Sequence, residues 1–123
     1  MSEKPLVSII IPLYNGSNFV EKAIQSALAQ TYSPVEIIVV NDGSTDNHAG
    51  RMICEKYSDS IFYYEKENGG CASALNFGIT KMTGEYFAWL SHDDGYAPTR
   101  IEDAVSLLKS HGLLGGKYIG FTE

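Results

Sequence analysis

The sequence lacks two features that would tie it to a membrane or to nucleic acid. No segment approaches the roughly 20 consecutive apolar residues that a helix needs to cross a bilayer. Lys and Arg are scattered, and nine basic residues stand against fifteen acidic ones, for a formal net charge of −6. This balance argues against a sequence-independent grip on nucleic acid phosphates or on an anionic membrane surface. A phosphorylated ligand would need positive charge from another source.

Cysteine is also scarce. Cys54 and Cys71 lack the paired spacing of a zinc site, and the first residues, MSEKPLVS, carry no apolar segment of the kind found in signal peptides. We therefore expect reduced thiols in a cytoplasmic protein. These features leave open a peripheral attachment to the inner face of a membrane.

Two runs rich in β-branched residues, at residues 6–13 and 35–40, are nearly uninterrupted in their apolar character. Such runs are typical of parallel strands that are covered on both faces. Between them, apolar residues recur at helical spacing over residues 19–28, and Asn18 with Glu21 has the form of a capping box. The three segments together predict a β-α-β unit.

The same alternation continues to the end of the chain. It predicts helices at residues 49–57, at 72–82 and after Pro98, and strands at 61–65, 86–90 and 117–122. The 123 residues are enough for one domain with a buried core. We therefore predict a single α/β domain over residues 1–123, with an open, mostly parallel sheet, helices on both faces and an end after the fifth strand.

Polar, Gly-rich or acidic clusters follow the first four predicted strands. They read PLYNGSN, NDGSTDN, EKENGG and SHDDGYAP. Each of them alone is compatible with an ordinary turn, because Asn-Gly and Asp-Gly pairs favour turns. In open parallel sheets, however, ligands bind beyond the carboxyl ends of the strands. All four clusters are therefore expected at one edge of the sheet.

The adjacent acids Asp93 and Asp94 belong to the fourth cluster. A solvated turn is the ordinary interpretation, but in a cleft two neighbouring carboxylates require a cation. Mg²⁺ or Mn²⁺ held by one or two carboxylates takes its remaining ligands from water and substrate phosphates. Such an ion would also let an acidic protein bind a diphosphate.

Four stretches in order carry a resemblance to a known family. They are VSIIIPLYNGSNFVEKAIQSALAQTY, VEIIVVNDGSTDN, ENGGCASALNFGI and TGEYFAWLSHDDGYAP. Over about residues 7–108 the sequence resembles the family 2 glycosyltransferases, whose Rossmann-like nucleotide-binding fold is called GT-A. No Walker loop or dinucleotide-binding Gly motif occurs in the sequence.

The resemblance implies a set of nucleotide-binding residues. Pro12, Tyr14 and Asn15 would line the base pocket, Asp42 would accept a hydrogen bond from the base, Asn68 and Gly69 would lie near the nucleotide, and Asp93, followed by Asp94, would bind the metal. A carboxylate is a suitable acceptor for a ring N–H.

The sequence departs from the family pattern at three places. Ser91 stands where many members have the first acid of the metal motif, and His92 would either take part of that role or face solvent. Leu75 stands where an arginine is common. The general base of family members lies later than the metal motif, and Glu123 is too close to that motif to match it. The catalytic residue is therefore unknown, and we expect the donor-binding half of a transferase.

The implied reaction is a metal-dependent, inverting transfer of a sugar from a nucleotide-diphosphate sugar, with a UDP-sugar as the commonest donor. The acceptor, whether a glycan, a lipid-linked sugar or a protein, is not indicated. Exposed apolar surface would favour self-association into a homo-oligomer. A non-catalytic nucleotide-sugar-binding or regulatory module remains the alternative.

Overall fold

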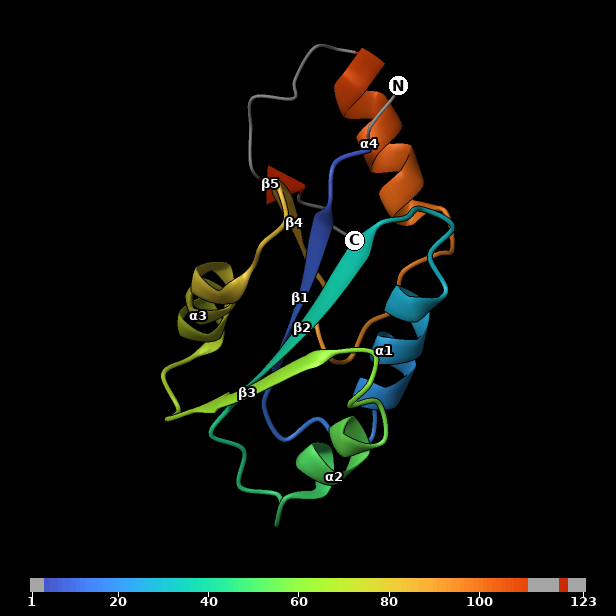
Figure 1. The fold of residues 1–123 in the computed structure, drawn as a ribbon. Coiled ribbons are helices and arrows are strands. Elements are labelled where there is room, and N and C mark those ends of the chain that lie inside the picture. The colour runs from blue at the N-terminus through green and yellow to red at the C-terminus, as the bar shows by residue number, and fades with distance from the viewer. Residues whose placement is uncertain (1–3, 111–117, 120–123) are drawn as a thin grey trace.

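The computed structural model describes residues 4–110 and 118–119. Within these residues, five parallel strands form a central sheet in the order β3-β2-β1-β4-β5 (Figure 1). The strands are β1 (Val7–Leu13), β2 (Val35–Asp42), β3 (Phe62–Lys66), β4 (Tyr86–Trp89) and β5 (Tyr118–Ile119). The open parallel sheet predicted from the sequence is confirmed. Of the strand predicted at 117–122, the residues other than Tyr118 and Ile119 lie outside the described part of the chain.

In the described part of the chain, four helices cover the two faces of the sheet. They are α1 (Val20–Leu28), α2 (Ala49–Glu55), α3 (Cys71–Lys81) and α4 (Arg100–Ser110). Helices α1, α2 and α4 lie on one face, and α3 lies on the other (Figure 1). Among the described residues, no helix is both long and apolar enough to cross a membrane.

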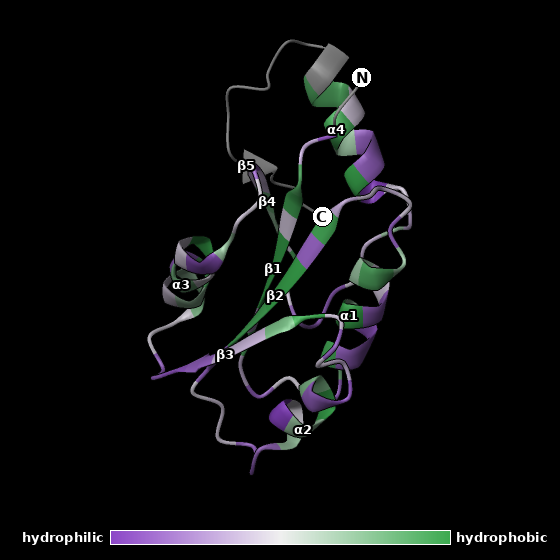
Figure 2. Ribbon diagram, in the orientation of Figure 1, coloured by the Kyte–Doolittle hydropathy of each residue, from purple (hydrophilic) through white to green (hydrophobic). Residues whose placement is uncertain are grey.

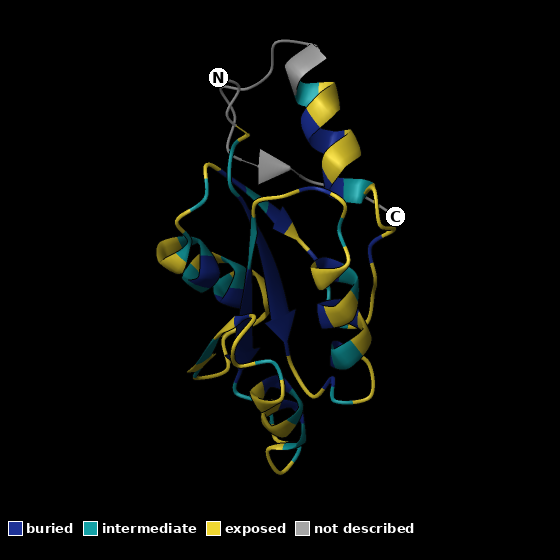
Figure 3. Cartoon of the chain, turned by 45° about the vertical axis from the view of Figure 1, so that its right-hand side comes forward, coloured by how far each residue is buried: buried dark blue, intermediate teal, exposed yellow. Residues whose placement is uncertain are grey.

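Strand β1 is buried along its whole length because helices cover both of its faces (Figures 2 and 3). Ile9 and Ile11 belong to the cluster packed under α1 and α4, whereas Ile10 belongs to the cluster under α3. Fully burying an isoleucine side chain contributes roughly 1.5–3 kcal/mol. The uninterrupted apolar run in the sequence therefore reflects two separate cores that share one strand.

The capping box predicted at the start of α1 is wrong. The N-cap residue is Phe19, and no side chain caps the helix. Instead, the backbone N–H groups of Phe19 and Val20 both donate to the carbonyl of Gly16 at 2.9 Å. The Glu21 carboxylate turns toward α2, where it accepts hydrogen bonds from Tyr57 and Lys56. The Glu21 side chain therefore contacts the end of α2 and does not form the capping box that the sequence predicts.

Candidate functional site

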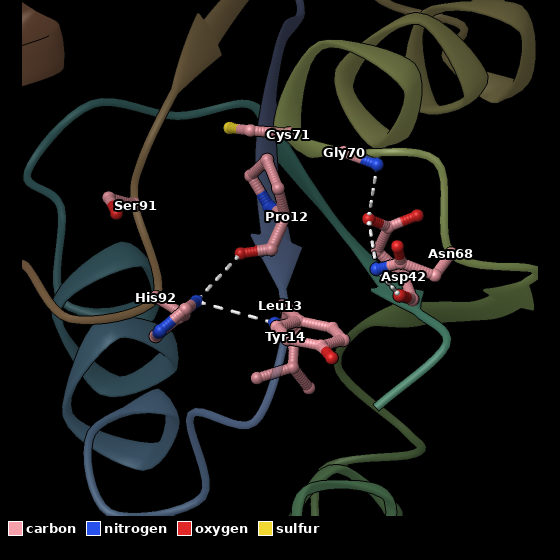
Figure 4. Close-up of a pocket in the computed structure, with 9 residues that line it drawn as sticks. All are labelled: Pro12, Leu13, Tyr14, Asp42, Asn68, Gly70, Cys71, Ser91 and His92. Atoms are coloured by element: carbon pink, nitrogen blue, oxygen red, sulfur yellow. Dashed lines mark hydrogen bonds between the residues drawn. The ribbon is translucent and has the colours of Figure 1, made fainter. Parts of the chain in front are cut away.

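A hollow of about 260 Å³ lies at the carboxyl ends of the central strands (Figure 4). It is lined by Pro12, Leu13, Tyr14, Asp42, Asn68, Gly70, Cys71, Ser91 and His92. Apart from Cys71, these residues come from the four polar clusters that follow the strands in the sequence. Ser91 and His92 lie on one side of the β1 end, and Asp42 and Asn68 lie on the other (Figure 4). This arrangement follows from the strand order, since β1 lies between β2 and β4.

The end of β1 forms the middle of the hollow. Pro12 is buried there, while Tyr14 is 43% exposed and leaves an aromatic surface available to a ligand. Asn15 adopts a positive φ of 50°, a conformation that asparagine tolerates better than most residues. Its backbone N–H donates to Ser44 Oγ at 3.0 Å, and its side-chain oxygen accepts from the N–H of Thr45 at 2.7 Å. Asn15 therefore joins two loops beside the hollow and is not part of its lining.

Asp42 ends β2 and is only 3% exposed. Its Oδ1 accepts from Lys66 Nζ at 2.9 Å and from the Gly69 N–H at 3.0 Å. Its Oδ2 accepts from Asn68 Nδ2 at 3.2 Å and from the Gly70 N–H at 2.8 Å. A carboxylate offers about four acceptor positions, so these four donors use its usual capacity. A hydrogen bond from a base would require one of them to give way.

The environment of Asp42 keeps it ionised. Burial by itself would raise the pKa of this carboxyl group, but hydrogen bonds from Lys66, Gly69 and Gly70 favour the charged form. The balance places the pKa of Asp42 below its ordinary value. Asp42 is therefore a carboxylate at neutral pH, and it organises the loop that follows β3.

That loop approaches the end of β2 closely. A Cβ on Gly43 would lie 2.6 Å from the backbone nitrogen of Asn68, and Gly43 has a positive φ of 71°. Gly70 has a φ of 100°, a backbone conformation that favours glycine. Gly69, which was predicted to lie near the nucleotide, is not part of the lining of the hollow. Cys71 is not among the site residues predicted from the sequence, although it directly follows the two glycines. Its side chain belongs to the first turn of α3 and lines the hollow.

His92 lines the hollow and is half-buried. A role for it in binding a ligand stays a prediction. Its Nδ1 lies 3.3 Å from the Pro12 carbonyl oxygen and 3.5 Å from the Tyr14 backbone nitrogen. The tautomer decides which contact is a hydrogen bond, since a protonated Nδ1 donates to Pro12 and an unprotonated Nδ1 accepts from Tyr14. A Cβ on Gly16 would lie 2.2 Å from the His92 ring, so the ring packs directly on that glycine.

Asp93 and Asp94 are both exposed and do not line the hollow described above. They line a neighbouring hollow of about 300 Å³ together with Phe19, Lys22 and Gly95. Ser91 Oγ donates to Asp93 Oδ1 at 2.7 Å. Because Ser91 lines the first hollow, this hydrogen bond places Asp93 next to its edge. No comparable side-chain bond links Asp94 to the lining among the described residues.

The donor set at these acids suits one kind of metal site. Within residues 4–110 and 118–119, no three or more His, Cys, Asp or Glu side chains come together in a group that could hold a metal ion. A protein-only cage of the zinc type is therefore not formed by the described residues. Two adjacent, accessible carboxylates do fit Mg²⁺ or Mn²⁺, which take their other ligands from water and substrate phosphates.

Comparison with known proteins identifies relatives along most of the chain. The profile of the family described as "Glycosyl transferase family 2" matches residues 8–121. An uncharacterized glycosyltransferase of Rickettsia felis is 62% identical over 104 residues, which is 85% of this chain. The matched part is only 17% of that relative's own length.

Solved structures match as well. A structure of S. aureus TarS 1–349 in complex with UDP-GlcNAc superposes with a TM-score of 0.75 at 26% identity, over 86% of this chain and 32% of that one. The mannosyltransferase PcManGT from Pyrobaculum calidifontis, in complex with GDP-Man and Mn²⁺, gives a TM-score of 0.74 at 29% identity, over 87% and 33%.

Proposed function

The chain belongs to glycosyltransferase family 2, and we propose that it binds the nucleotide-diphosphate sugar for an inverting, metal-dependent sugar transfer. The observation that carries the proposal is the single hollow lined by residues of all four polar clusters. The hollow has a mostly apolar, aromatic middle at Pro12 and Tyr14 and polar groups on both sides. A nucleotide has the same division between a flat base and a polar ribose diphosphate.

The nucleoside would lie over Pro12 and Tyr14, against the wall that Asp42 and Asn68 form. Gly69 supports this wall from outside the lining through its hydrogen bond to Asp42, and Asn15 joins the neighbouring loop at Ser44 and Thr45. The diphosphate would lie toward His92 and Asp93, since Ser91 connects the hollow to the Asp93 carboxylate. Base and phosphates would thus contact opposite sides of the β1 end.

A Mg²⁺ or Mn²⁺ ion at Asp93, with Asp94 beside it, would neutralise the negative charge that develops on the departing diphosphate. In the proposed reaction, an acceptor oxygen forms a bond to the anomeric carbon as the bond from that carbon to the diphosphate breaks. The proton of the acceptor hydroxyl passes to a general base. No residue of this chain is assigned as that base.

UDP-sugars and GDP-sugars are the first donors to test, because the two structural relatives contain UDP-GlcNAc and GDP-Man. Calorimetric titration with UDP and GDP, first with Mn²⁺ and then with EDTA, tests metal-dependent binding. We expect affinity for at least one nucleotide and a loss of affinity in EDTA. Equal affinity in both conditions would remove the metal from the proposal.

The two acids are distinguished by single variants. Asp93→Ala should weaken nucleotide binding when Mn²⁺ is present and leave the weaker binding in EDTA unchanged. Asp94→Ala should have a smaller effect, because Asp93 is the acid linked to the hollow through Ser91. A larger effect of Asp94→Ala than of Asp93→Ala would show that Asp94, and not Asp93, is the main metal ligand.

Transfer is tested separately from binding. The chain spans less than a fifth of the length of the Rickettsia felis relative, so the acceptor site and base are sought by comparing this chain with that longer protein. Both are incubated with UDP- and GDP-sugars and mixed acceptors, and products are detected by mass spectrometry. If both proteins bind a nucleotide sugar and neither transfers the sugar, the result would favour the non-catalytic module.

A further inference from the structure

Lys66 occupies an unusual place for a lysine. It ends β3 and lies directly beside Asp42 in the register of β2 and β3. Its ammonium donates to Asp42 Oδ1 at 2.9 Å and to the carbonyl of Glu67 at 2.6 Å. The side chains of Lys66 and Asp42 are only 17% and 4% exposed. Lysine is rarely so buried unless it is paired, because desolvation of its charge is costly.

The other ion pairs of the described residues are different in kind. Lys56 and Glu21 join α2 to α1 through side chains that are 58% and 37% exposed. Exposed pairs of this type contribute little, since water screens them. The pair of Lys66 and Asp42 is instead withdrawn from water at the wall of the hollow.

The packing around Lys66 depends on a glycine. A Cβ on Gly69 would lie 3.1 Å from Lys66 Nζ and 2.7 Å from Ser73 Oγ. Any larger residue at position 69 would therefore press on the ammonium and on α3. The same glycine donates its N–H to Asp42 Oδ1, so the ammonium and the loop backbone meet at one carboxylate oxygen.

We propose that Lys66 is a positioning residue for nucleotide binding, which holds Asp42 and residues 68–70 in the arrangement that forms one wall of the hollow. This inference rests on the proposed function of the hollow. Lys66 itself does not line the hollow, so it acts through Asp42 and the loop. Asn68 also donates to the Asp42 backbone carbonyl at 2.9 Å, which adds a second tie between the same two segments.

Removing the ammonium would leave Asp42 buried with its charge only partly compensated. Its Oδ1 would keep the Gly69 N–H as a donor, and the loss of Lys66 would favour the protonated form of the carboxyl. Besides Lys66, which pairs with Asp42, the titratable side chains that line the hollow with it are Cys71 from α3, and Tyr14 and His92. None of the last three carries a permanent positive charge that replaces the ammonium.

The test uses Lys66→Met, which keeps the length of the aliphatic stem and removes the charge. Lys66→Arg restores a charge at the same position, and Lys56→Met is the matched control because it removes an exposed ion pair away from the hollow. Affinity for UDP and GDP is measured by calorimetry with Mn²⁺. Hydrogen exchange at the amides of Gly69 and Gly70 is measured without nucleotide.

We expect Lys66→Met to weaken nucleotide binding by about 10-fold or more, the range of one lost charge-assisted hydrogen bond. Exchange at Gly69 and Gly70 should accelerate in Lys66→Met by a larger factor than in the strands of the core. Lys66→Arg should recover part of both effects, and Lys56→Met should change neither. If Lys66→Met does not fold, Gly69→Ala perturbs the same contact while keeping the charge, because its methyl group would press on the Lys66 ammonium and on Ser73.

Unchanged affinity and unchanged exchange at Gly69 and Gly70 in Lys66→Met would overturn the inference. A uniform rise of exchange over the whole chain, with no recovery in Lys66→Arg, would also overturn it, because the role would then be general stability. If the wild-type chain binds neither UDP nor GDP, the proposed function fails, and the exchange data alone decide whether Lys66 holds the loop.

Discussion

Asp42→Asn is the most informative single change for the hollow. It keeps the size of the side chain but replaces one acceptor oxygen by an NH₂ group. Lys66 and Gly69 donate to one oxygen of Asp42, and Asn68 and Gly70 donate to the other. Whichever way the new amide is turned, two donors therefore face another donor.

The cost follows from these four contacts. A buried donor that loses its acceptor costs about 1–3 kcal/mol. Asn68 Nδ2 keeps the Asp42 carbonyl as a second acceptor, so we take the lower part of the range, about 2–4 kcal/mol for the two donors. For a domain of this size, 1 kcal/mol corresponds to a Tm change of about 3–5 °C. Asp42→Asn should thus lower Tm by roughly 10 °C at pH 7.

Thermal unfolding followed by circular dichroism measures this difference. Glu21→Gln is the control. Like Asp42, Glu21 is a carboxylate that accepts several hydrogen bonds, here from Tyr57 and Lys56, but it lies at the surface between α1 and α2. It should shift Tm much less than Asp42→Asn. A wild-type Tm in Asp42→Asn would refute the reasoning and leave Asp42 as an ordinary turn residue.

The pH dependence gives a second check with a defined sign. The pKa of Asp42 lies below its ordinary value in the folded chain. Its contribution to stability is therefore fully present above the unfolded pKa of about 3.9 and is lost as the pH falls through the lower folded pKa. The Tm difference between wild type and Asp42→Asn should stay constant from pH 7 to about 5 and narrow below about pH 4. A difference that widens in acid would contradict this assignment.

Three further predictions concern the other side of the hollow and the two thiols. Gly16→Ala should displace the His92 ring, on which the new methyl group would clash, and should weaken UDP binding in calorimetry. Lys56→Met, which changes an exposed ion pair away from the hollow, should not weaken it. Burial and nearby Asp42 raise the pKa of Cys71, so its alkylation by iodoacetamide should accelerate only above the pH range usual for cysteine and should be slowed by UDP. Burial raises the pKa of Cys54 to about 12, and mass spectrometry should find it unmodified in the folded chain.

The strands and the edge that carries the hollow could be predicted from the sequence. The apolar runs at residues 6–13 and 35–40 overlap β1 and β2 because a strand covered on both faces has no solvent-facing position for a polar side chain. Parallel strands place all their carboxyl ends at one edge, so the polar clusters that follow them had to meet there. The family resemblance, and not this rule, implied the individual site residues; of these, Pro12, Tyr14, Asp42, Asn68 and His92 line the hollow, whereas Asn15, Gly69, Asp93 and Asp94 do not.

Only the tertiary structure decided which of these groups touch one another. His92 lies beside Pro12 although 80 positions separate them, and Lys66 pairs with Asp42 across 24 positions. Neither partner carries a local signal, because periodicity and turn chemistry report on neighbours within a few residues. The same limit explains the wrong capping box, since Glu21 accepts its hydrogen bond from Tyr57 in the turn after α2. Such pairings depend on strand order and on which helices share a face, and these are settled when the whole sheet is packed.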